Sequence, residues 1–267
     1  MVDISFLMIT NRPFELYAKK TCNFIRDAID LFIPKYSYEI VIVSPHEIKP
    51  DGDDVKIVVD PENIDGRGAA AYNLGYKHTS GRFISIMNDD RVVEPKILRV
   101  ISLLDGPYFR NRKYKVTSLG ASSVPQISCL EEHMLWNCYC TRSVPNLKYP
   151  PQHDGLQLSA ELSKIKYLEF PHRYTIFGYP VFEKETIDNY LDGVVFNPRF
   201  KHHYADNWLP YWLGEMGEYP ITCLGTELPG FGGPESSTDN DAYDYGVFVN
   251  LVDNFVAGVN CSYGRIA

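Results

Sequence analysis

Short apolar runs alternate with segments of helical periodicity through the first half of the chain. The apolar runs predict buried strands at Ile4–Thr10, Glu39–Val43, Val55–Val59 and Arg82–Met87. Apolar residues recur at spacings of three and four from Phe14 to about Leu31, which predicts a helix ended by Pro34. Further helices are predicted over Ala69–His78 and Pro95–Leu104. This alternation predicts a Rossmann-like α/β domain, with a mainly parallel central sheet covered by helices on both faces.

The second half of the chain is less regular. Extended segments are predicted at Tyr114–Leu119, Met134–Thr141, Tyr167–Phe170 and Thr175–Phe177. Helices are predicted at Leu156–Ile165, Glu183–Leu191, Asp206–Met216 and Tyr245–Val256. The compositions of Asn146–Gly155 and Leu228–Asp241 predict loops, the second of them mobile and able to close over a ligand.

Composition and charge narrow the class of protein. The chain has 267 residues, 45% of them hydrophobic and 22% charged, which suits one large ordered domain or a domain with an appendage. The formal net charge is −8, and no basic stripe runs along the sequence, so a duplex nucleic-acid binder is not expected. An acidic protein can still bind an anionic nucleotide when a divalent cation lies between the two.

The six cysteines form neither a CxxC pair nor a ladder of Cys and His ligands. The first apolar run, Ile4–Ile9, is too short to span a bilayer, and Asp3 directly before it does not suit a signal peptide. We therefore expect free thiols, no transmembrane segment and a cytoplasmic location, with peripheral attachment to a membrane left open.

Asn88-Asp89-Asp90, directly after a predicted strand, carries the clearest chemical signal. Ligands of parallel sheets bind at the carboxyl ends of strands, and Thr10-Asn11-Arg12 ends another strand. Carboxylates such as Asp90, helped by Asp89, suit Mg²⁺ or Mn²⁺, and such an ion neutralises a diphosphate leaving group. The Asn88 amide suits a ribose hydroxyl. The alternative is a solvated turn or a helix N-cap.

The order of these segments resembles family-2-like glycosyltransferases of the GT-A fold. The resemblance rests on ISFLMITNR, EIVIV, VKIVV, the helix with Asn73 and Gly75, and GRFISIMNDD, whose last three residues match the DxD motif. It continues through the segment from Phe177 to Phe182 and through the segment from Leu191 to Gly217, and is weak between residues 106 and 165.

That resemblance implies a GT-A domain over residues 1–225, followed by a loop and helix over 226–267. Residues 1–105 would form the nucleotide-sugar half, and residues 106–225 the acceptor half with a smaller mixed sheet. It implies a metal-dependent, inverting transfer from a nucleotide-diphosphate sugar, with a UDP-sugar expected, to a hydroxyl of a glycan or polysaccharide precursor. The implied donor-binding residues are Thr10, Asn11, Arg12, Ser44, Asn73, Asn88 and Asp89. Asp90 takes the metal position, Asp206 the general-base position and Tyr179 a position on the acceptor side.

Three further residues are weaker candidates with ordinary structural alternatives. Arg67, in a glycine loop before a helix, could contact a phosphate or be a surface arginine. His203 could contact the acceptor or be a partly buried, hydrogen-bonded histidine. Trp208 could stack on a sugar ring, but its helical spacing also suits a core position.

Departures from the family pattern keep two other functions open. Asn88 stands where the family has its first Asp, Ser44 begins the turn where the family has an acidic base contact, and Ala205 replaces the Glu before the base. These changes leave room for a non-catalytic nucleotide-sugar or carbohydrate-binding protein with a degenerate site. A sugar nucleotidyltransferase is the less favoured alternative, because the turn after the first strand lacks the glycines that hold a triphosphate.

Overall fold

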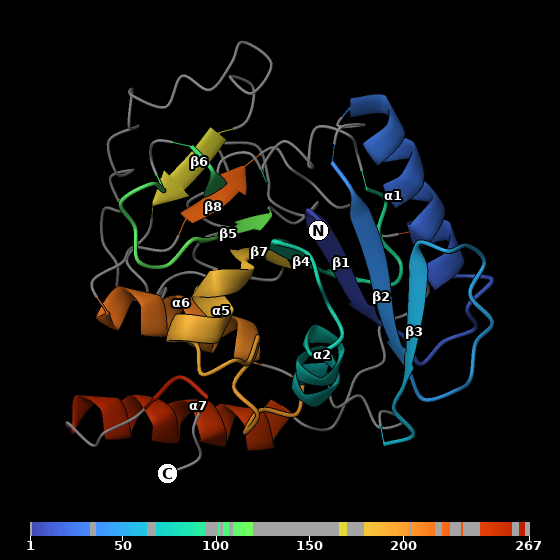
Figure 1. The fold of residues 1–267 in the computed structure, drawn as a ribbon. Coiled ribbons are helices and arrows are strands. Elements are labelled where there is room, and N and C mark those ends of the chain that lie inside the picture. Colours follow the sequence, from blue (N-terminus) through green and yellow to red (C-terminus); the bar gives the residue numbers. More distant parts are fainter. Residues whose placement is uncertain are drawn as a thin grey trace.

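The computed structural model describes residues 2–32, 36–62, 68–93, 101, 104–106, 109–119, 166–169, 179–202, 204–216, 221–224, 231, 241–257 and 262–264. Their strands form one eight-stranded sheet in the order β3-β2-β1-β4-β7-β5-β8-β6. Helices lie on both faces of this sheet (Figure 1), as the alternating sequence pattern predicts.

The first half of the sheet is parallel. It contains β1 (Ile4–Ile9), β2 (Tyr38–Ser44), β3 (Val55–Val59) and β4 (Phe83–Asn88), with β1 paired to both β2 and β4. Alternate residues of β1 enter different cores: Phe6 and Met8 pack on the side of α1, whereas Leu7 packs with α2. Burial on both faces explains why β1, β2 and β4 read as continuous apolar runs rather than as alternating ones.

Helix α1 (Ala18–Phe32) begins later than the periodicity of the sequence predicts. Residues 14–17 form turns instead, in which Leu16 N–H donates to Pro13 O and Lys19 N–H donates to Phe14 O. Phe14 still packs into the core of the α1 face, so its apolar spacing reflects burial rather than helix. Helix α2 (Gly68–Tyr76) covers the opposite face.

The second half of the sheet has mixed direction. Strand β7 (Tyr179–Glu183) is antiparallel to β4 and to β5 (Val116–Leu119), whereas β8 (Ile221–Leu224) is parallel to β5. Strand β6 (Lys166–Glu169) is antiparallel to β8. The mixed strands therefore continue the parallel ones in a single sheet.

Three helices complete the face of the sheet that α2 covers. They are α5 (Lys184–Tyr190), α6 (Ala205–Glu215) and α7 (Asp241–Val256). Figure 1 shows α7 beneath α6, farther from the sheet, and Val247 and Leu251 of α7 enter the same core as Trp212 of α6. The C-terminal helix is thus packed into the domain, and it begins four residues before the predicted Tyr245.

Several expected segments lie outside the described residues: Met134–Thr141, Asn146–Gly155, Leu156–Ile165, Thr175–Phe177 and all of Leu228–Asp241 except Phe231 and Asp241. Of Pro95–Leu104, only Ile101 and Leu104 are described, both helical. The sequence pattern gave no indication of β8.

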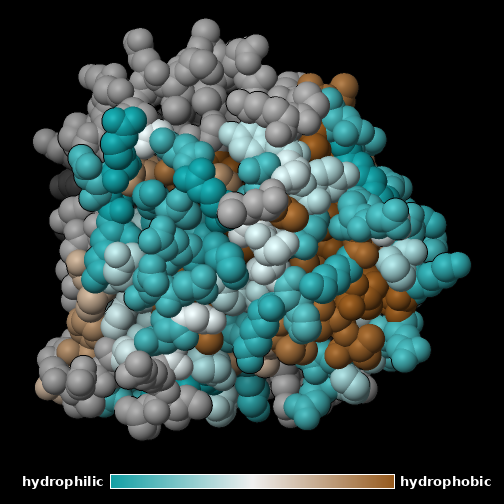
Figure 2. All heavy atoms as spheres, viewed as in Figure 1, coloured by the Kyte–Doolittle hydropathy of each residue, from teal (hydrophilic) through white to brown (hydrophobic). Residues whose placement is uncertain are grey.

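The surface is mostly hydrophilic, with a hydrophobic area beside the β2–β3 edge of the sheet (Figure 2). Val59, the last residue of edge strand β3, is 44% exposed. Among the described residues, no helix combines the length and the apolar character needed to cross a membrane.

Candidate functional site

The carboxyl ends of β1 and β4 meet at the point where the strand order reverses. The chain runs from β1 outward to β2 and β3 and then returns to β4 on the other side of β1. Ile9 and Asn88 are register partners, so the residues that follow them, Thr10 and Asp89, lie side by side. Ligands of doubly wound sheets bind at such a switch point.

The turn after β1 holds the side chain of Asp89. Asp89 is only 4% exposed. Thr10 Oγ1 donates to Asp89 Oδ2 at 2.5 Å, and Arg12 Nε donates to the same oxygen at 3.2 Å. Arg12 Nη2 also contacts Asp89 Oδ1. A buried carboxylate needs such partners, and here the turn after β1 supplies them.

Arg12 extends across to the second carboxylate. Its Nη2 lies 3.0 Å from Asp90 Oδ2, and its guanidinium lies 4.0 Å from the centre of the Tyr17 ring. Burial acts to lower the pKa of Arg12, but its hydrogen bonds and charge interactions with Asp89 and Asp90 outweigh burial and hold the pKa above its ordinary value.

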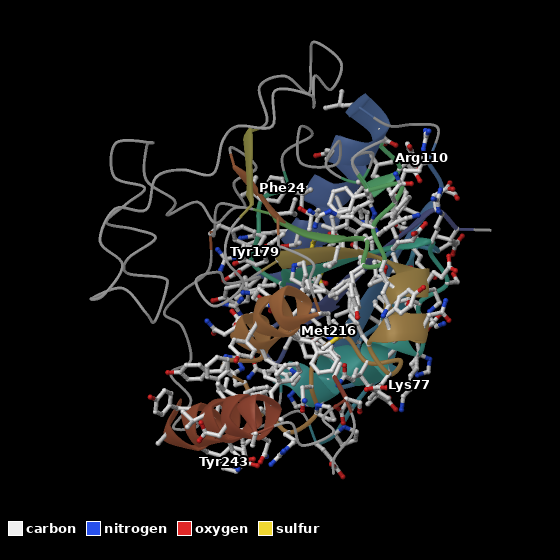
Figure 3. The ribbon with its side chains drawn as sticks, turned by 90° about the vertical axis from the view of Figure 1, so that its left-hand side faces the viewer. Phe24, Lys77, Arg110, Tyr179, Met216 and Tyr243 are labelled. Atoms are coloured by element: carbon white, nitrogen blue, oxygen red, sulfur yellow. The ribbon has the colours of Figure 1, made fainter. Side chains whose placement is uncertain are left out.

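Asp90 faces a second arginine. Arg91 Nε lies 3.2 Å from Asp90 Oδ1, and the Arg91 guanidinium lies 5.2 Å from the centre of the Tyr179 ring on β7. Asp90 Oδ1 is buried and, within the described part of the chain, accepts no hydrogen bond. Tyr179, labelled in Figure 3, therefore borders this cluster through Arg91.

The backbone of the motif is tied to α1 and to Phe231. The fully buried Thr21 donates from Oγ1 to Asp89 O at 2.9 Å and accepts from Arg91 N–H at 3.1 Å. Phe231 N–H donates to Asp90 O at 3.0 Å. The ring of Phe231 packs on Phe24 of α1, also labelled in Figure 3, with centroids 5.9 Å apart. Part of the expected closing loop thus contacts the motif.

Tyr72 is a site residue that sequence reasoning missed. Its Oη donates to Met87 O at 3.0 Å and lies 3.3 Å from Asn88 Oδ1, so it holds the end of β4. Burial raises the pKa of Tyr72, which therefore acts as a neutral donor. In the sequence, only its position directly before Asn73 could have indicated a role in the site. A tyrosine at that position of α2 is explained equally well by apolar helical packing.

Ser44 and Asn11, which are also predicted to bind the nucleotide sugar, lie at the same edge of the sheet. Thr10 N–H donates to Val43 O at 2.9 Å, which brings the end of β1 beside the end of β2 and Ser44. The Ser44 hydroxyl accepts from His46 N–H at 3.1 Å and so stabilises the turn after β2. Asn11, by contrast, is exposed on the turn between Thr10 and Arg12.

Asn73 has a structural role instead of facing the cluster. Its Oδ1 accepts from Val195 N–H at 2.9 Å and from Phe196 N–H at 3.0 Å, and its Nδ2 donates to Phe196 O at 2.7 Å. The residue is 8% exposed. Its amide anchors the segment after α5, and we do not retain it among the proposed donor contacts.

The segment before α6 approaches the carboxyl end of β1. A Cβ built on Gly68 would lie 3.2 Å from His202 Nδ1 and 3.7 Å from Ile9 Cδ1. Asp244 of α7 is 0% exposed and accepts from the backbone N–H groups of Lys201, at 2.8 Å, and His202, at 2.9 Å. This anchored segment leads through Tyr204, whose φ is 60°, into α6. Asp206, in the first turn of α6, is partly exposed.

Trp208 lies in the core and not on an acceptor surface. It is 0% exposed and stacks on Tyr211, with ring centroids 5.7 Å apart. Trp208 lies one turn into α6, on the helix face that packs into the apolar core. This burial corrects the prediction that Trp208 contacts a sugar. Arg67 and His203 lie outside the described residues.

The described residues contain no cluster of three or more His, Cys, Asp or Glu side chains suited to a metal ion. Next to the cradle of Thr10, Arg12 and Asp89, the buried Oδ1 of Asp90 accepts no hydrogen bond from the described residues. Because Mg²⁺ and Mn²⁺ often take one or two protein carboxylates and complete their shell with phosphate and water, this donor set fits such an ion.

No protein-family model and no curated protein matches this sequence. Solved structures match by fold. TarS from S. aureus in complex with UDP-GlcNAc has a TM-score of 0.59 at 13% identity, over 98% of this chain and 68% of that chain. TarS in complex with UDP has a TM-score of 0.52 at 13% identity, over 85% of this chain and 59% of that chain. A mycobacterial protein has a TM-score of 0.52 at 12% identity, over 98% of this chain and 76% of that chain.

TarS is a GT-A-type glycosyltransferase. The present chain has the GT-A fold. It spans only part of the length of TarS, 59% of the chain in a structure of TarS residues 1–349. In this GT-A fold the Thr10, Arg12, Asp89 and Asp90 cluster occupies the switch point of the parallel half of the sheet.

Proposed function

We propose that this chain is a glycosyltransferase that uses a nucleotide-diphosphate sugar, with a UDP-sugar as donor. The observation that carries the proposal is the convergence of Thr10, Arg12, Asp89 and Asp90 at the switch point of a GT-A sheet. The TarS structures of the same fold, solved with UDP and with UDP-GlcNAc, support the choice of nucleotide.

Asp90 would hold a Mg²⁺ or Mn²⁺ ion through its carboxylate, helped by Asp89. Once bound, such an ion neutralises the charge that develops on the leaving diphosphate. Arg12 and Arg91 lie at the same cluster and can donate to phosphate oxygens, and a guanidinium suits such bidentate contacts. Asn88, at the end of β4, is the proposed partner of the ribose.

Asp206 is the proposed general base. The acceptor hydroxyl oxygen attacks the anomeric carbon and forms the new glycosidic bond while its proton passes to the Asp206 carboxylate. The bond from the anomeric carbon to the diphosphate breaks, and the diphosphate leaves with the electron pair. Attack opposite the leaving group inverts the anomeric centre. The first turn of α6 keeps Asp206 partly exposed, and the Asp244 anchor fixes the segment before it.

The proposed acceptor is a hydroxyl of a glycan or polysaccharide precursor. Tyr179 lies on β7 and contacts Arg91, which also faces Asp90, so Tyr179 is the proposed aromatic contact of the acceptor. Its ring is mostly buried, which favours an edge contact over a broad stacking platform.

A second candidate is a nucleotide-sugar-binding protein without turnover. It is favoured by the arginines that already neutralise Asp89 and Asp90. An assay of UDP release from several UDP-sugars, with and without Mn²⁺ and with simple glycoside acceptors, separates the two. Acceptor-dependent release that Asp90→Ala abolishes supports the transferase. Binding without release by the wild-type protein supports the second candidate.

A further inference from the structure

We propose that Arg12 is the built-in counter-ion of the Asp89–Asp90 pair, and that a divalent cation binds there only by displacing the Arg12 guanidinium from Asp90. This inference rests on the proposed function, because it concerns the metal that Asp90 would hold.

The guanidinium of Arg12 takes the place of a bridging cation. Its Nη2 contacts Asp89 Oδ1 and lies 3.0 Å from Asp90 Oδ2, so one nitrogen serves both carboxylates. Its Nε holds the other oxygen of Asp89 at 3.2 Å. A divalent ion that approaches Asp90 would therefore encounter the positive charge of Arg12, which already lies there.

The charges of the cluster balance without a metal. Arg12 and Arg91 contribute two positive charges, and Asp89 and Asp90 contribute two negative charges. A divalent ion added to this neutral set would lie at short range from two guanidinium groups, where repulsion between like charges is strong. One arginine has to move before the ion binds tightly.

Arg12 is the arginine that can leave. Asp89 keeps its 2.5 Å hydrogen bond from Thr10 Oγ1 after Arg12 departs, so no buried carboxylate loses every partner. The side chain of Arg12 is 26% exposed and packs against the face of Tyr17, whereas that of Arg91 is 16% exposed.

The chain supplies a matched control. Arg26 of α1 bridges Asp51 at 2.9 Å and Asp54 at 2.8 Å, and its side chain is 23% exposed. It has the same charge and a similar pairing to two aspartates, but it lies away from the switch point. Removing Arg26 tests for a general effect of losing one positive charge.

The experiment titrates Mn²⁺ into the full chain without nucleotide and follows free Mn²⁺ by electron paramagnetic resonance. We expect Arg12→Gln to bind Mn²⁺ about tenfold more tightly than wild type, a typical size for coupling between two competing groups. Arg12→Lys, which keeps the positive charge, should bind Mn²⁺ more weakly than Arg12→Gln does. Arg26→Gln should have the same Mn²⁺ affinity as wild type.

A second measurement uses the unmodified protein, in case Arg12→Gln does not fold. In ¹⁵N-labelled wild type, saturation with Mg²⁺ should shift the Nε–H resonance of Arg12, assigned by its loss in Arg12→Lys, and leave that of Arg26 in place. Equal Mn²⁺ affinity of wild type and Arg12→Gln, or an Arg12 resonance that stays fixed when Mg²⁺ binds, overturns the inference alone. Absence of binding to any of the proteins overturns it together with the proposed metal site.

Discussion

Thr10 Oγ1 donates a 2.5 Å hydrogen bond to Asp89 Oδ2, and this bond joins the ends of β1 and β4 across 79 positions of sequence. It connects the turn after the first strand to the acidic motif, so the same contact shapes the site and stabilises the sheet. Its loss should therefore affect both.

We predict that Thr10→Val, a change of similar shape, lowers the free energy of unfolding by about 1.5–3 kcal/mol, the range for hydrogen bonds to charged groups. It should also weaken nucleotide binding, because Asp89 loses a fixed partner. Chemical denaturation and calorimetric titration with UDP measure the two effects. Thr79→Val is the control, since Thr79 donates to Tyr76 O at the end of α2 and should affect stability only. Equal nucleotide affinity in all three proteins would contradict the role given to Thr10.

Asn73 should matter for stability and not for donor binding. Asn73→Ala removes three buried hydrogen bonds to the backbone of residues 195 and 196 and leaves those groups unpaired. We expect a loss of at least about 2 kcal/mol of unfolding free energy, since each buried unsatisfied group costs about 1–3 kcal/mol.

Asn189→Ala, at an exposed position of α5, should be nearly neutral by comparison. The affinity of folded Asn73→Ala for UDP, measured at low temperature, should equal that of wild type. A selective loss of affinity with unchanged stability would return Asn73 to the donor site.

Asp206→Asn tests the general base. The amide cannot accept the proton at neutral pH, so we predict that kcat falls by about 10²–10⁴-fold, the usual contribution of a positioned base. The dissociation constant for UDP should not change, because Asp206 acts on the acceptor side. Asp253→Asn, on the exposed side of α7, should retain full activity. Wild-type turnover by Asp206→Asn would exclude this role for Asp206.

Glu39 should make stability sensitive to acid. Burial acts to raise the pKa of Glu39, but hydrogen bonds from Ser5 and Ser80 outweigh it and hold the pKa below the ordinary value of 4.5. A carboxyl whose pKa is lower in the folded state stabilises the fold above its unfolded pKa, and this contribution is lost as pH falls through the folded pKa.

Unfolding free energies at neutral pH and at several values below 4.5 should therefore converge for wild type and Glu39→Gln as the pH falls. Glu47→Gln, at an exposed carboxylate, is the control. A constant difference between wild type and Glu39→Gln at every pH would contradict this assignment.

The parallel half of the fold follows from the sequence because its signals are local. Each strand from β1 to β4 is a separate run rich in apolar residues, and β3 matches its predicted bounds, Val55–Val59. The position of Asp89 and Asp90 at the end of β4 then follows from their place after such a run.

Other features depend on contacts between distant residues and could not be predicted in this way. The four residues of β8 carry too few positions to show a period, and the strand is specified by its pairing with β5 and β6. Trp208 has a spacing that suits either a core or a surface face of α6, and only packing decides between them. The anchoring of residues 201 and 202 by Asp244 joins segments with no shared local pattern.

The most direct test of the central claim is thermal unfolding of wild type and Asp90→Ala with UDP, GDP or CDP, each with and without Mn²⁺. A ligand at about a hundred times its dissociation constant stabilises by roughly 2.7 kcal/mol, which should raise the midpoint by several degrees for a chain of this size. We predict a Mn²⁺-dependent rise with UDP that Asp90→Ala abolishes. No rise with any nucleotide, or the same rise in Asp90→Ala, would contradict a nucleotide-sugar site at the ends of β1 and β4.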